Sequence, residues 1–488
     1  MQRKPGQFDE VLNRIRGKSM DLGERHLRFG TGKVVILYIK QLTDRKSLAE
    51  QVIGPLLQYD RSQSLSAREA VESVIFADDC ILSSDTSQIE RHILDGMTVL
   101  LFSDDRQYVV VNLKQVEKRS TTEPVMTYTI RGPRDSLVEN LDSNLSLIRY
   151  RLKSESLRID MLQAGRRNHS QIAVIYFEDI ANGQTVEEIK KRIGAIDVDG
   201  LSSSGELQAY LLNNRIGLFP QMGIVERSDM ACGALLEGKV IVLMDGSPWA
   251  LVAPKVFTEY LWSCDDFYMN RFIATFQRIL RIIALNLAFI VSSLYVAVVS
   301  YHSDALPSAY MIAIAQARAN VPFSAILEVL FIELIGEIIR ESLVRVPTKI
   351  GTAIGIVGAI IIGQAAVAAG VFSPLILIVI SLSLISSFVP SDYTIMDPFR
   401  VLKYPLILAT SMFGLYGFTL TIVFVLAQLV SINTFGAPYM APLAPFNLKD
   451  FFKSIIYSKP HAPRRPVYLN TKDNTRGPVP PNNGPQPK

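Results

Sequence analysis

The sequence predicts an α/β cytoplasmic domain of two related subdomains joined by a long helix, followed by an all-α polytopic membrane domain and a disordered C-terminal tail. The first observation is a boundary in charge. Residues 1–281 are rich in charged side chains, whereas three later runs contain none: 282–300, 350–391 and 404–448. A hydrocarbon core of about 30 Å takes roughly 20 helical residues, so these runs can cross a membrane. The other observations are an internal repeat in the charged half and a polar, proline-rich end.

The N-terminal segment, residues 1–30, has no apolar core and does not resemble a secretory signal. We therefore expect the N-terminal half to stay in the cytoplasm. Arg271, Arg278 and Arg281 precede the first charge-free run, and the positive-inside rule assigns that side to the cytoplasm as well. The three cysteines are widely spaced, so neither a disulfide framework nor a zinc site is expected.

The internal repeat predicts two related α/β subdomains. Residues 94–111 align without gaps with residues 236–253 at an offset of 142, and each block has the pattern of a strand, a polar turn and a second strand. Upstream, residues 37–39 match residues 175–177 at an offset of 138. Chance similarity of hairpins is the alternative, but two blocks in the same order favour duplication.

The subdomains are placed at 31–130 and 166–270, and one long helix is expected to connect them over 131–165. Its apolar positions recur at three- and four-residue steps: Leu137, Leu141, Leu145, Ile148 and Leu152. Its arginines either contact phosphate or acidic partners or form ion pairs between the subdomains: Arg131, Arg134, Arg149 and Arg151.

The transmembrane domain is placed at 271–448, with four to six spanning or re-entrant helices. The candidate segments are 282–300, 322–344, 350–371, 375–390 and 405–431. If both termini are cytoplasmic, the number of crossings must be even, so either one segment is partial or 432–448 completes a sixth crossing. We expect 322–344 to be the partial one, because it carries a cluster of charges that disfavours contact with lipid.

That charged segment is the candidate functional element. One set of side chains falls within about 100° on a helical wheel, Glu333, Glu337, Arg340 and Glu341, whereas Glu328 lies on another side. Ionisable groups at membrane depth are costly, so the set forms either a cation-attracting vestibule or gating contact, or internal ion pairs. The pairs at helical spacing are Glu337 with Arg340 and Glu341 with Arg345.

The next segment carries small residues at every fourth position: Gly351, Gly355, Ala359 and Gly363. Such a ladder lets helix backbones pack closely, either within one chain or between copies. Its hydrogen-bonding side chains are Thr352 and Gln364, and Gln364 either faces a pore, bonds to a neighbouring helix or surrounds a symmetry axis. The candidate ion-pathway or gating residues are therefore Glu328, Glu333, Glu337, Arg340, Glu341, Arg345, Thr352 and Gln364.

Neither half contains a recognisable catalytic, metal-binding or cofactor-binding motif, so we expect no enzyme activity and no cofactor. The five histidines are far apart in the sequence. The tail, residues 449–488, is basic and proline-rich and is expected to be largely disordered, with its cations near an anionic membrane surface. Because the net charge of +4 is smaller than the tail's own excess, nucleic-acid binding is not expected.

Nine motifs, taken in order, resemble the A-type subunits of the GerA family of spore germination proteins, over about residues 130–446. They are RGPRDSLVENLDSNLSLIRYRL at 131–152, ERSD at 226–229, LEGKVIVLMDGSP at 236–248, DDFY at 265–268, YVAVVSYH at 295–302, ARANVPF at 317–323, RESLVRVP at 340–347, IGIVGAIIIGQAAVAAGVFSP at 354–374 and GAPYMAPLAP at 436–445.

The resemblance implies a subunit of a germinant receptor in the inner membrane of the bacterial spore. It also implies partners, a transporter-like B subunit that binds the nutrient and a lipoprotein C subunit. The A subunit of that family is expected to form a homo-oligomeric ring, pentameric in the family, that acts as an ion channel and releases cations. A ring multiplies each acid by the number of subunits, as carboxylate rings do in cation channels.

The chain departs from the family pattern at Ser228, where the family usually has proline, and at Ser292-Ser293 before the YVA motif, where the family also usually has a proline. These changes affect backbone rigidity and leave the charges in place. The related sporulation-operon A-type protein stays open as an assignment. Two other functions also stay open: a secondary transporter, for which Ser373-Pro374 supplies a helix break, and a membrane scaffold that anchors germination partners.

Overall fold

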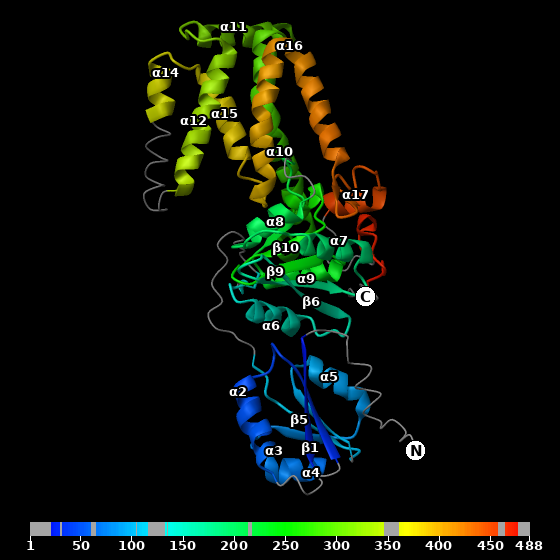
Figure 1. Ribbon diagram of the computed structural model, residues 1–488. Coiled ribbons are helices and arrows are strands. Elements are labelled where there is room, and N and C mark those ends of the chain that lie inside the picture. The colour runs from blue at the N-terminus through cyan, green and yellow to red at the C-terminus, as the bar shows by residue number, and fades with distance from the viewer. Residues whose placement is uncertain are drawn as a thin grey trace, which may run out of the picture.

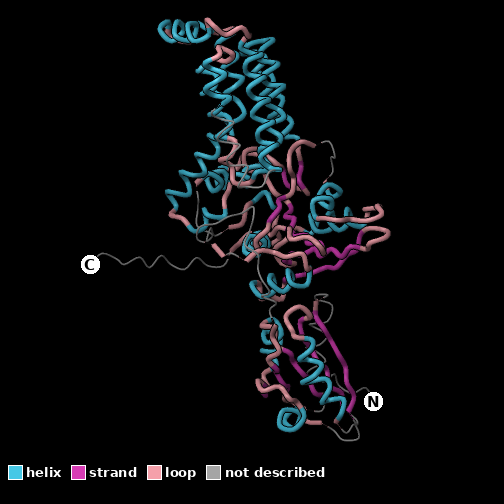
Figure 2. The backbone as a smooth tube through the Cα atoms, turned by 90° about the vertical axis from the view of Figure 1, so that its left-hand side faces the viewer, coloured by secondary structure: helices cyan, strands magenta, loops and turns pink. Residues whose placement is uncertain are grey.

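The computed structural model arranges the chain in three parts along one axis, with two α/β subdomains below a bundle of helices (Figure 1). Figure 2, turned by 90°, shows strands in the two lower parts and long helices in the upper part. We call the end of the bundle beside the α/β subdomains the near end and the opposite end the far end. The structure describes residues 21–29, 32–59, 65–103, 105–115, 132–133, 135–212, 217–345, 361–456 and 464–476.

The first subdomain is an antiparallel sheet of five strands in the order β1-β2-β4-β5-β3. Its helices cover both faces of the sheet, so β4 and β5 are buried at every residue and do not alternate between polar and apolar. The strands are β1 Leu22–Phe29, β2 Gly32–Ile39, β3 Cys80–Ser83, β4 Thr98–Phe102 and β5 Tyr108–Val111. The helical elements are α2 Arg45–Ser47, η1 Leu48–Ile53, α3 Gly54–Gln58, α4 Ala67–Glu69, η2 Ala70–Val74, η3 Thr86–Gln88 and α5 Ile89–Leu94.

The second subdomain has the same architecture, with strand order β6-β7-β9-β10-β8. Helices α6 and α9 pack on one face of the sheet, and α7 and α8 on the other. The strands are β6 Leu157–Ala164, β7 Ser170–Phe177, β8 Gly223–Val225, β9 Val240–Met244 and β10 Ala250–Ala253. The helices are α6 Leu141–Arg151, α7 Gly183–Gly194, α8 Ser204–Leu211 and α9 Ser228–Glu237.

The predicted repeat is reproduced in the strand register. Leu100 pairs with Val109 in the first sheet, and the residues 142 positions later, Val242 and Leu251, pair in the second. The other predicted offset is reproduced too, because β2 pairs with β4 as β7 pairs with β9. The α/β prediction for the N-terminal half, with two similar sheets, is therefore confirmed.

The predicted connecting helix is wrong in its length. Helix α6 ends at Arg151, and the chain then forms strand β6 from Leu157. The reason is tertiary, because Leu157 and Ile159 pair with Phe177 and Ile175 of β7. The hydrogen bonds between these strands outweigh the local helical pattern of the sequence. The predicted apolar positions from Leu137 to Leu152 do form part of the core of the second subdomain.

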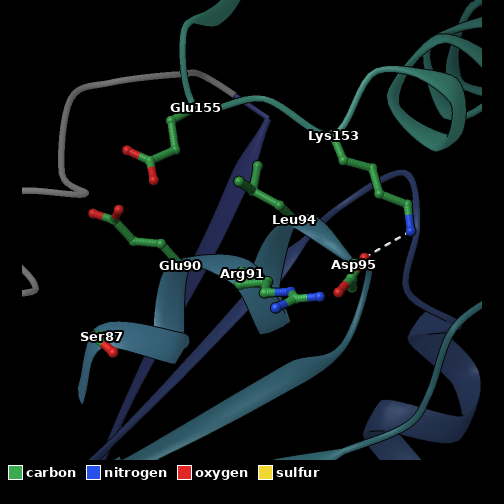
Figure 3. A pocket seen from close by; sticks show the side chains of 7 residues that line it. All are labelled: Ser87, Glu90, Arg91, Leu94, Asp95, Lys153 and Glu155. Atoms are coloured by element: carbon green, nitrogen blue, oxygen red, sulfur yellow. Dashed lines mark hydrogen bonds and ion pairs between the residues drawn. The ribbon is translucent and has the colours of Figure 1, made fainter. Parts of the chain in front are cut away.

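Ion pairs join the two α/β subdomains. Arg149 donates to Asp21 at 2.5 Å from Nε, and both side chains are buried. Lys153 Nζ lies 2.6 Å from Asp95 at the edge of a polar pocket that also includes Glu90, Arg91 and Glu155 (Figure 3). Arg149 thus takes the ion-pairing alternative predicted for the arginines of this segment; Arg131 and Arg134 lie outside the described residues.

The helical bundle contains two helices long and apolar enough to cross a membrane, Arg271–Ser300 and Tyr393–Ser431, among the described residues. At the junction with the α/β subdomains, Arg278 and Arg281 of α10 both donate to the buried Asp266. The elements of the bundle are α10 Arg271–Ser300, α11 Ser308–Arg318, α12 Ala325–Arg345, η7 Ile361–Ala365, α14 Ala366–Ala368, α15 Pro374–Ser386 and α16 Met396–Ser431. The connecting elements are η4 Phe257–Leu261, η5 Cys264–Tyr268, η6 Ser303–Ala305 and η8 Tyr393–Ile395.

Helix α16 is a hairpin of two arms, where the sequence predicted a single segment at 405–431. Its backbone leaves the helical conformation at Gly414, with φ 58° and ψ −141°. Near Gly414 the chain contacts the far end of α10, since Leu415 N donates to His302. Phe399 and Leu429, from the two arms, lie together in one apolar cluster at the near end. Each arm of roughly 17 residues is about 26 Å long, which approaches the thickness of a hydrocarbon core.

The charged helix α12, predicted to be a partial membrane segment, runs along the bundle between its far and near ends (Figure 1). Its residue Glu328 contacts Ser373 before α15, and Arg340 contacts Ser387 after α15. Helices α12 and α15 are therefore parallel. The helix crosses the bundle because other helices supply partners for its charges.

Parts of the C-terminal tail are ordered, contrary to the prediction of disorder. Helix α17, Leu448–Ile455, packs at the near end of the bundle, after the short strands β11 Asn433–Thr434 and β12 Ala437–Pro438. Residues 464–476, which include η9 Val467–Leu469, pack on the second subdomain. The buried Arg465 donates to the carbonyl of Leu236 at the end of α9, and Tyr468 donates to Glu259. These tertiary contacts order a polar, proline-rich segment that would not fold alone.

Candidate functional site: a row of buried charges in the helical bundle

Helix α12 is apolar towards the outside of the bundle and charged towards its interior. Its exposed side chains recur at helical spacing, with 55% of Leu327, 60% of Phe331, 52% of Leu334 and 60% of Ile338 accessible. Glu328, Glu333 and Arg340, on other faces, are buried. A soluble helix has the opposite pattern, whereas membrane proteins keep ionisable groups inside the bundle.

The central member of the row is the ion pair of Glu333 with Lys403 from the first arm of α16. Lys403 Nζ lies 3.1 Å from Glu333 Oε2 and donates to Ser383 Oγ of α15 at 2.9 Å. Ser292 of α10 donates to the other oxygen of Glu333. Four helices thus meet at one buried and fully hydrogen-bonded charge pair.

The next member towards the near end is Glu337. Arg400 of α16 donates to it from Nε at 3.1 Å, and Arg340 approaches it at 3.3 Å from Nη1. Arg340 also donates to Ser387 Oγ at 2.6 Å and lies 5.0 Å from the ring centre of Phe388. The predicted pair of Glu337 with Arg340 is present, and Arg400 of α16 binds the same carboxylate.

Glu328 is at the far end of the row and is fully buried, although the helical wheel separated it from the other acids. One of its oxygens accepts a hydrogen bond from the backbone N–H of Ser373, at the N-terminus of α15. The other lies 3.5 Å from Arg318 at the end of α11. Helices α10 and α15 both pack against this part of α12.

The remaining predicted residues lie elsewhere. Glu341 and Arg345 form the predicted ion pair, but 63% and 76% of the two side chains are exposed, so they are not part of the row. Gln364 is exposed, and a Cβ atom at Gly363 would meet nothing within 4 Å. Four predicted residues lie outside the described residues: Gly351, Thr352, Gly355 and Ala359.

Sequence reasoning missed the cations of α16. Arg400 and Lys403 lie just before the charge-free run that begins at Tyr404. In the sequence they mark only the start of that run. The available signal was their spacing: they are three residues apart, as close on a helix as Glu333 and Glu337 are in α12. Two antiparallel helices that each carry two such charges can pair them in register.

The row extends from Glu328 to Arg340, about 18 Å along the helix axis, which is more than half of a hydrocarbon core. Its charges are paired between helices, so any movement of α16 relative to α12 must break or exchange those pairs. A buried pair that loses one partner costs about 3–5 kcal/mol. The arrangement can therefore hold one conformation of the bundle and resist others. Within the described ranges, no group of three or more His, Cys, Asp or Glu side chains could hold a metal ion.

Comparison with known proteins identifies relatives over almost the whole chain. The model of a family described as Bacillus/Clostridium GerA spore germination protein matches residues 10–467. Spore germination protein GerLA of Bacillus cereus is 34% identical over 478 residues, which covers 96% of this chain and 97% of the relative. Spore germination protein KA of Bacillus subtilis (strain 168) is 31% identical over 466 residues, which covers 94% of this chain and 86% of the relative.

A crystal structure of the N-terminal domain of the A subunit of the Bacillus megaterium spore germinant receptor GerK3 is also similar, with 21% identity and a TM-score of 0.39. The match covers 52% of this chain and 96% of that chain. The family model and the two full-length relatives confirm the resemblance seen in the sequence motifs. The chain belongs to the GerA family of spore germination proteins.

Proposed function

We propose that the chain is the A-type membrane subunit of a spore germinant receptor, and that a ring of these subunits conducts cations across the inner membrane of the spore when a partner subunit binds a nutrient. The observation that carries the proposal is the row of paired charges inside a bundle whose outer surface is apolar. Charges at this depth are expensive, and a purely anchoring bundle would not need them.

The bundle crosses the membrane six times. Helices α10, α12 and α15 and the two arms of α16 each run between the near and far ends, and the parallel directions of α12 and α15 require one further crossing between them. An even number places the α/β subdomains and the C-terminal segment on one side. Contacts of residues 464–476 with the second subdomain support this, and Arg271, Arg278 and Arg281 favour the cytoplasmic side.

The charge row acts as the gate of the channel. Each buried acid already has a cation from another element, which disfavours a water-filled cation path through the middle of a single subunit. The pairs between α12 and α16 instead hold the closed arrangement. Opening exchanges these partners, and the free energy of germinant binding in the B subunit, with the C subunit in the complex, biases that exchange.

The conduction path lies along the face that carries Gln364. In a single subunit this amide is exposed in an otherwise apolar stretch, where a lipid contact would leave it without hydrogen bonds. A ring places the same side chain around the symmetry axis, in contact with water and ions. The open space at Gly363 allows a neighbouring helix to approach closely.

The test is to reconstitute the chain with its partner subunits in vesicles and to measure oligomeric state and cation flux with and without germinant. Glu337→Gln should raise the flux without germinant, because it removes the carboxylate that both Arg340 and Arg400 contact. Glu341→Gln is the matched control, since it removes a carboxylate of the same helix from an exposed pair. Gln364→Leu should change conductance, and Gly363→Leu should prevent assembly while leaving the subunit folded.

Monomers without conductance under every partner condition would exclude the channel and leave the scaffold. Equal flux from Glu337→Gln and Glu341→Gln would exclude the gate but keep the channel. A secondary transporter would need a binding site at a helix break near the midplane of the membrane. The break at Gly414 lies at the far end of the bundle, so it does not supply such a site.

A further inference from the structure

Helix α17 has one buried side and one exposed apolar side. Asp450 and Ser454 are buried, whereas 57% of Leu448 and 50% of Phe452 are exposed, as is 64% of Phe446 just before the helix. Lys449, beside these apolar side chains, is exposed as well. A short helix with aromatic and aliphatic side chains on one side and a lysine at its border is typical of a membrane–water interface.

Contacts with three other elements hold α17 in this orientation. Trp262 Nε1 donates to the carbonyl of Ser454 at 3.1 Å, and Arg278 of α10 donates to the carbonyls of Lys453 and Ser454 at 3.4 and 3.3 Å. These are carbonyls of the last turn, which otherwise lack partners, and a cation there is favourable. Asp450 accepts a hydrogen bond from Val467 N at 2.8 Å. The apolar side therefore cannot turn inwards without loss of these bonds.

The contact with Arg278 also fixes the level of α17 along the bundle. The charge-free part of α10 starts after Arg281 and runs from Ile282 to Ser300, a length of about 29 Å at 1.5 Å per residue. This length matches a hydrocarbon core of about 30 Å. Helix α17 consequently lies at the near edge of the apolar band, where headgroups meet the hydrocarbon.

The surface of α10 at this level supports a lipid as the occupant. Its exposed apolar stripe continues below Arg281, with 66% of Phe276 and 82% of Phe272 accessible, so the apolar exterior of the bundle reaches the level of α17. The chain from residue 449 to its end contains eight Lys and Arg against two Asp, and Lys449 and Lys453 of these belong to α17 itself, whereas Arg465 is buried on the second subdomain. This excess is complementary to an anionic lipid surface, which attracts each nearby cation with about 1 kcal/mol.

We propose that α17 is an interfacial anchor, whose exposed side inserts Phe446, Leu448 and Phe452 among acyl chains and places Lys449 against anionic phospholipid headgroups. The proposal rests on the proposed membrane crossing of the bundle. It places the junction between the α/β subdomains and the bundle at the depth of the lipid headgroups. Because Arg278 ties α17 to α10, which also packs against α16, the anchor connects the lipid surface to the helices of the proposed gate.

The test is electron paramagnetic resonance of the full chain in lipid nanodiscs, with a nitroxide on a single introduced cysteine and the native ones replaced (Cys80→Ser, Cys232→Ala, Cys264→Ser). Collisions with oxygen and with a water-soluble nickel complex give the depth of each label. Position 452 is compared with Leu420, exposed by 58% on the second arm of α16, and with Phe76, exposed by 72% in the first subdomain. We expect a depth at 452 between those two.

A second series compares nanodiscs of phosphatidylcholine with and without phosphatidylglycerol. The anionic lipid should immobilise the label at 452, and Lys449→Glu, which changes the charge by two units, should lower this preference for anionic lipid about 30-fold. Lys33→Glu, at an exposed position of β2, should have no effect.

Three outcomes separate the proposals. A label at 452 that is as accessible to nickel as the label at 76, with a lipid-like label at 420, overturns the anchor and leaves the membrane crossing. A label at 452 hidden from both reagents overturns the lipid assignment in favour of a protein partner or a second copy of the chain. Water-like accessibility at 420 as well overturns the proposed membrane crossing itself.

Discussion

Lys403 Nζ of α16 lies 3.1 Å from Glu333 Oε2 of α12, although the two residues are 70 positions apart in the sequence, and 7% and 3% of the two side chains are exposed. Loss of one partner leaves an uncompensated buried charge. We predict that Lys403→Met lowers the free energy of unfolding by about 3–5 kcal/mol, and that the double change Glu333→Gln with Lys403→Met recovers most of this loss.

Thermal unfolding in a fixed detergent would measure the effect, with Glu341→Gln as the control from an exposed pair of the same helix. The control should change stability by less than about 0.5 kcal/mol. If the double change is as destabilising as the sum of the two single changes, the two side chains are not coupled.

Gly414 separates the two arms of α16 and has a backbone conformation that other residues rarely adopt. A Cβ atom there would lie 3.2 Å from His302 Nε2 and 3.2 Å from Tyr301 Cγ. We predict that Gly414→Ala costs about 1–3 kcal/mol, because strain adds to the crowding. Gly233→Ala is the control, since this glycine lies in α9 with nothing within 4 Å of the added atom. Similar effects of both changes on thermal unfolding would contradict the hairpin.

The thiols of the second subdomain should resist alkylation. Burial raises the pKa of Cys232 to about 12 and that of Cys264 to about 11. At pH 8 the thiolate fractions are then about 10⁻⁴ and 10⁻³, and each rises about tenfold per pH unit below its pKa. Mass spectrometry after iodoacetamide treatment should show much slower labelling of Cys232 in the folded chain than in urea. Equal rates in both conditions would mean that Cys232 is accessible.

The ordered C-terminal segment depends on Tyr468, whose hydroxyl donates to Glu259 Oε1 at 2.7 Å. Lys239 pairs with the same oxygen at 2.6 Å, and burial raises the pKa of Tyr468 above its usual value. Tyr468→Phe removes a hydrogen bond to a buried charge, and we predict a loss of about 1.5–3 kcal/mol. Limited proteolysis should then cleave within 464–476 faster. Tyr310→Phe, at an exposed tyrosine of α11, should leave the cleavage rate unchanged.

The sequence was sufficient to predict both sheets, since repeated blocks at offsets of 142 and 138 must form the same elements when they bury the same apolar side chains. It also predicted the helix break before Pro374 and the ion pairs of α12 at helical spacing. These features are local, because the period and spacing of neighbouring residues decide them.

The failures have one physical cause, which is that distant parts of the chain replaced the expected local partners. Residues after Arg151 became a strand because β7 pairs with them, and residues 464–476 became ordered because α9 and Glu259 bind them. The hairpin of α16 has the same cause, since the sequence predicted a single segment at 405–431. The chain of α16 folds back at Gly414, where the turn packs against His302 and Tyr301.

Composition, charge-free runs and the repeat alone establish a charged α/β half, an apolar helical half and the acids of α12. Only the tertiary structure decides that Lys403 and Arg400 neutralise Glu333 and Glu337, and that α17 presents its apolar side outwards. The reason is that periodicity reports which side of a helix is apolar, whereas the cost of a buried charge depends on the side chains that packing brings within hydrogen-bond distance.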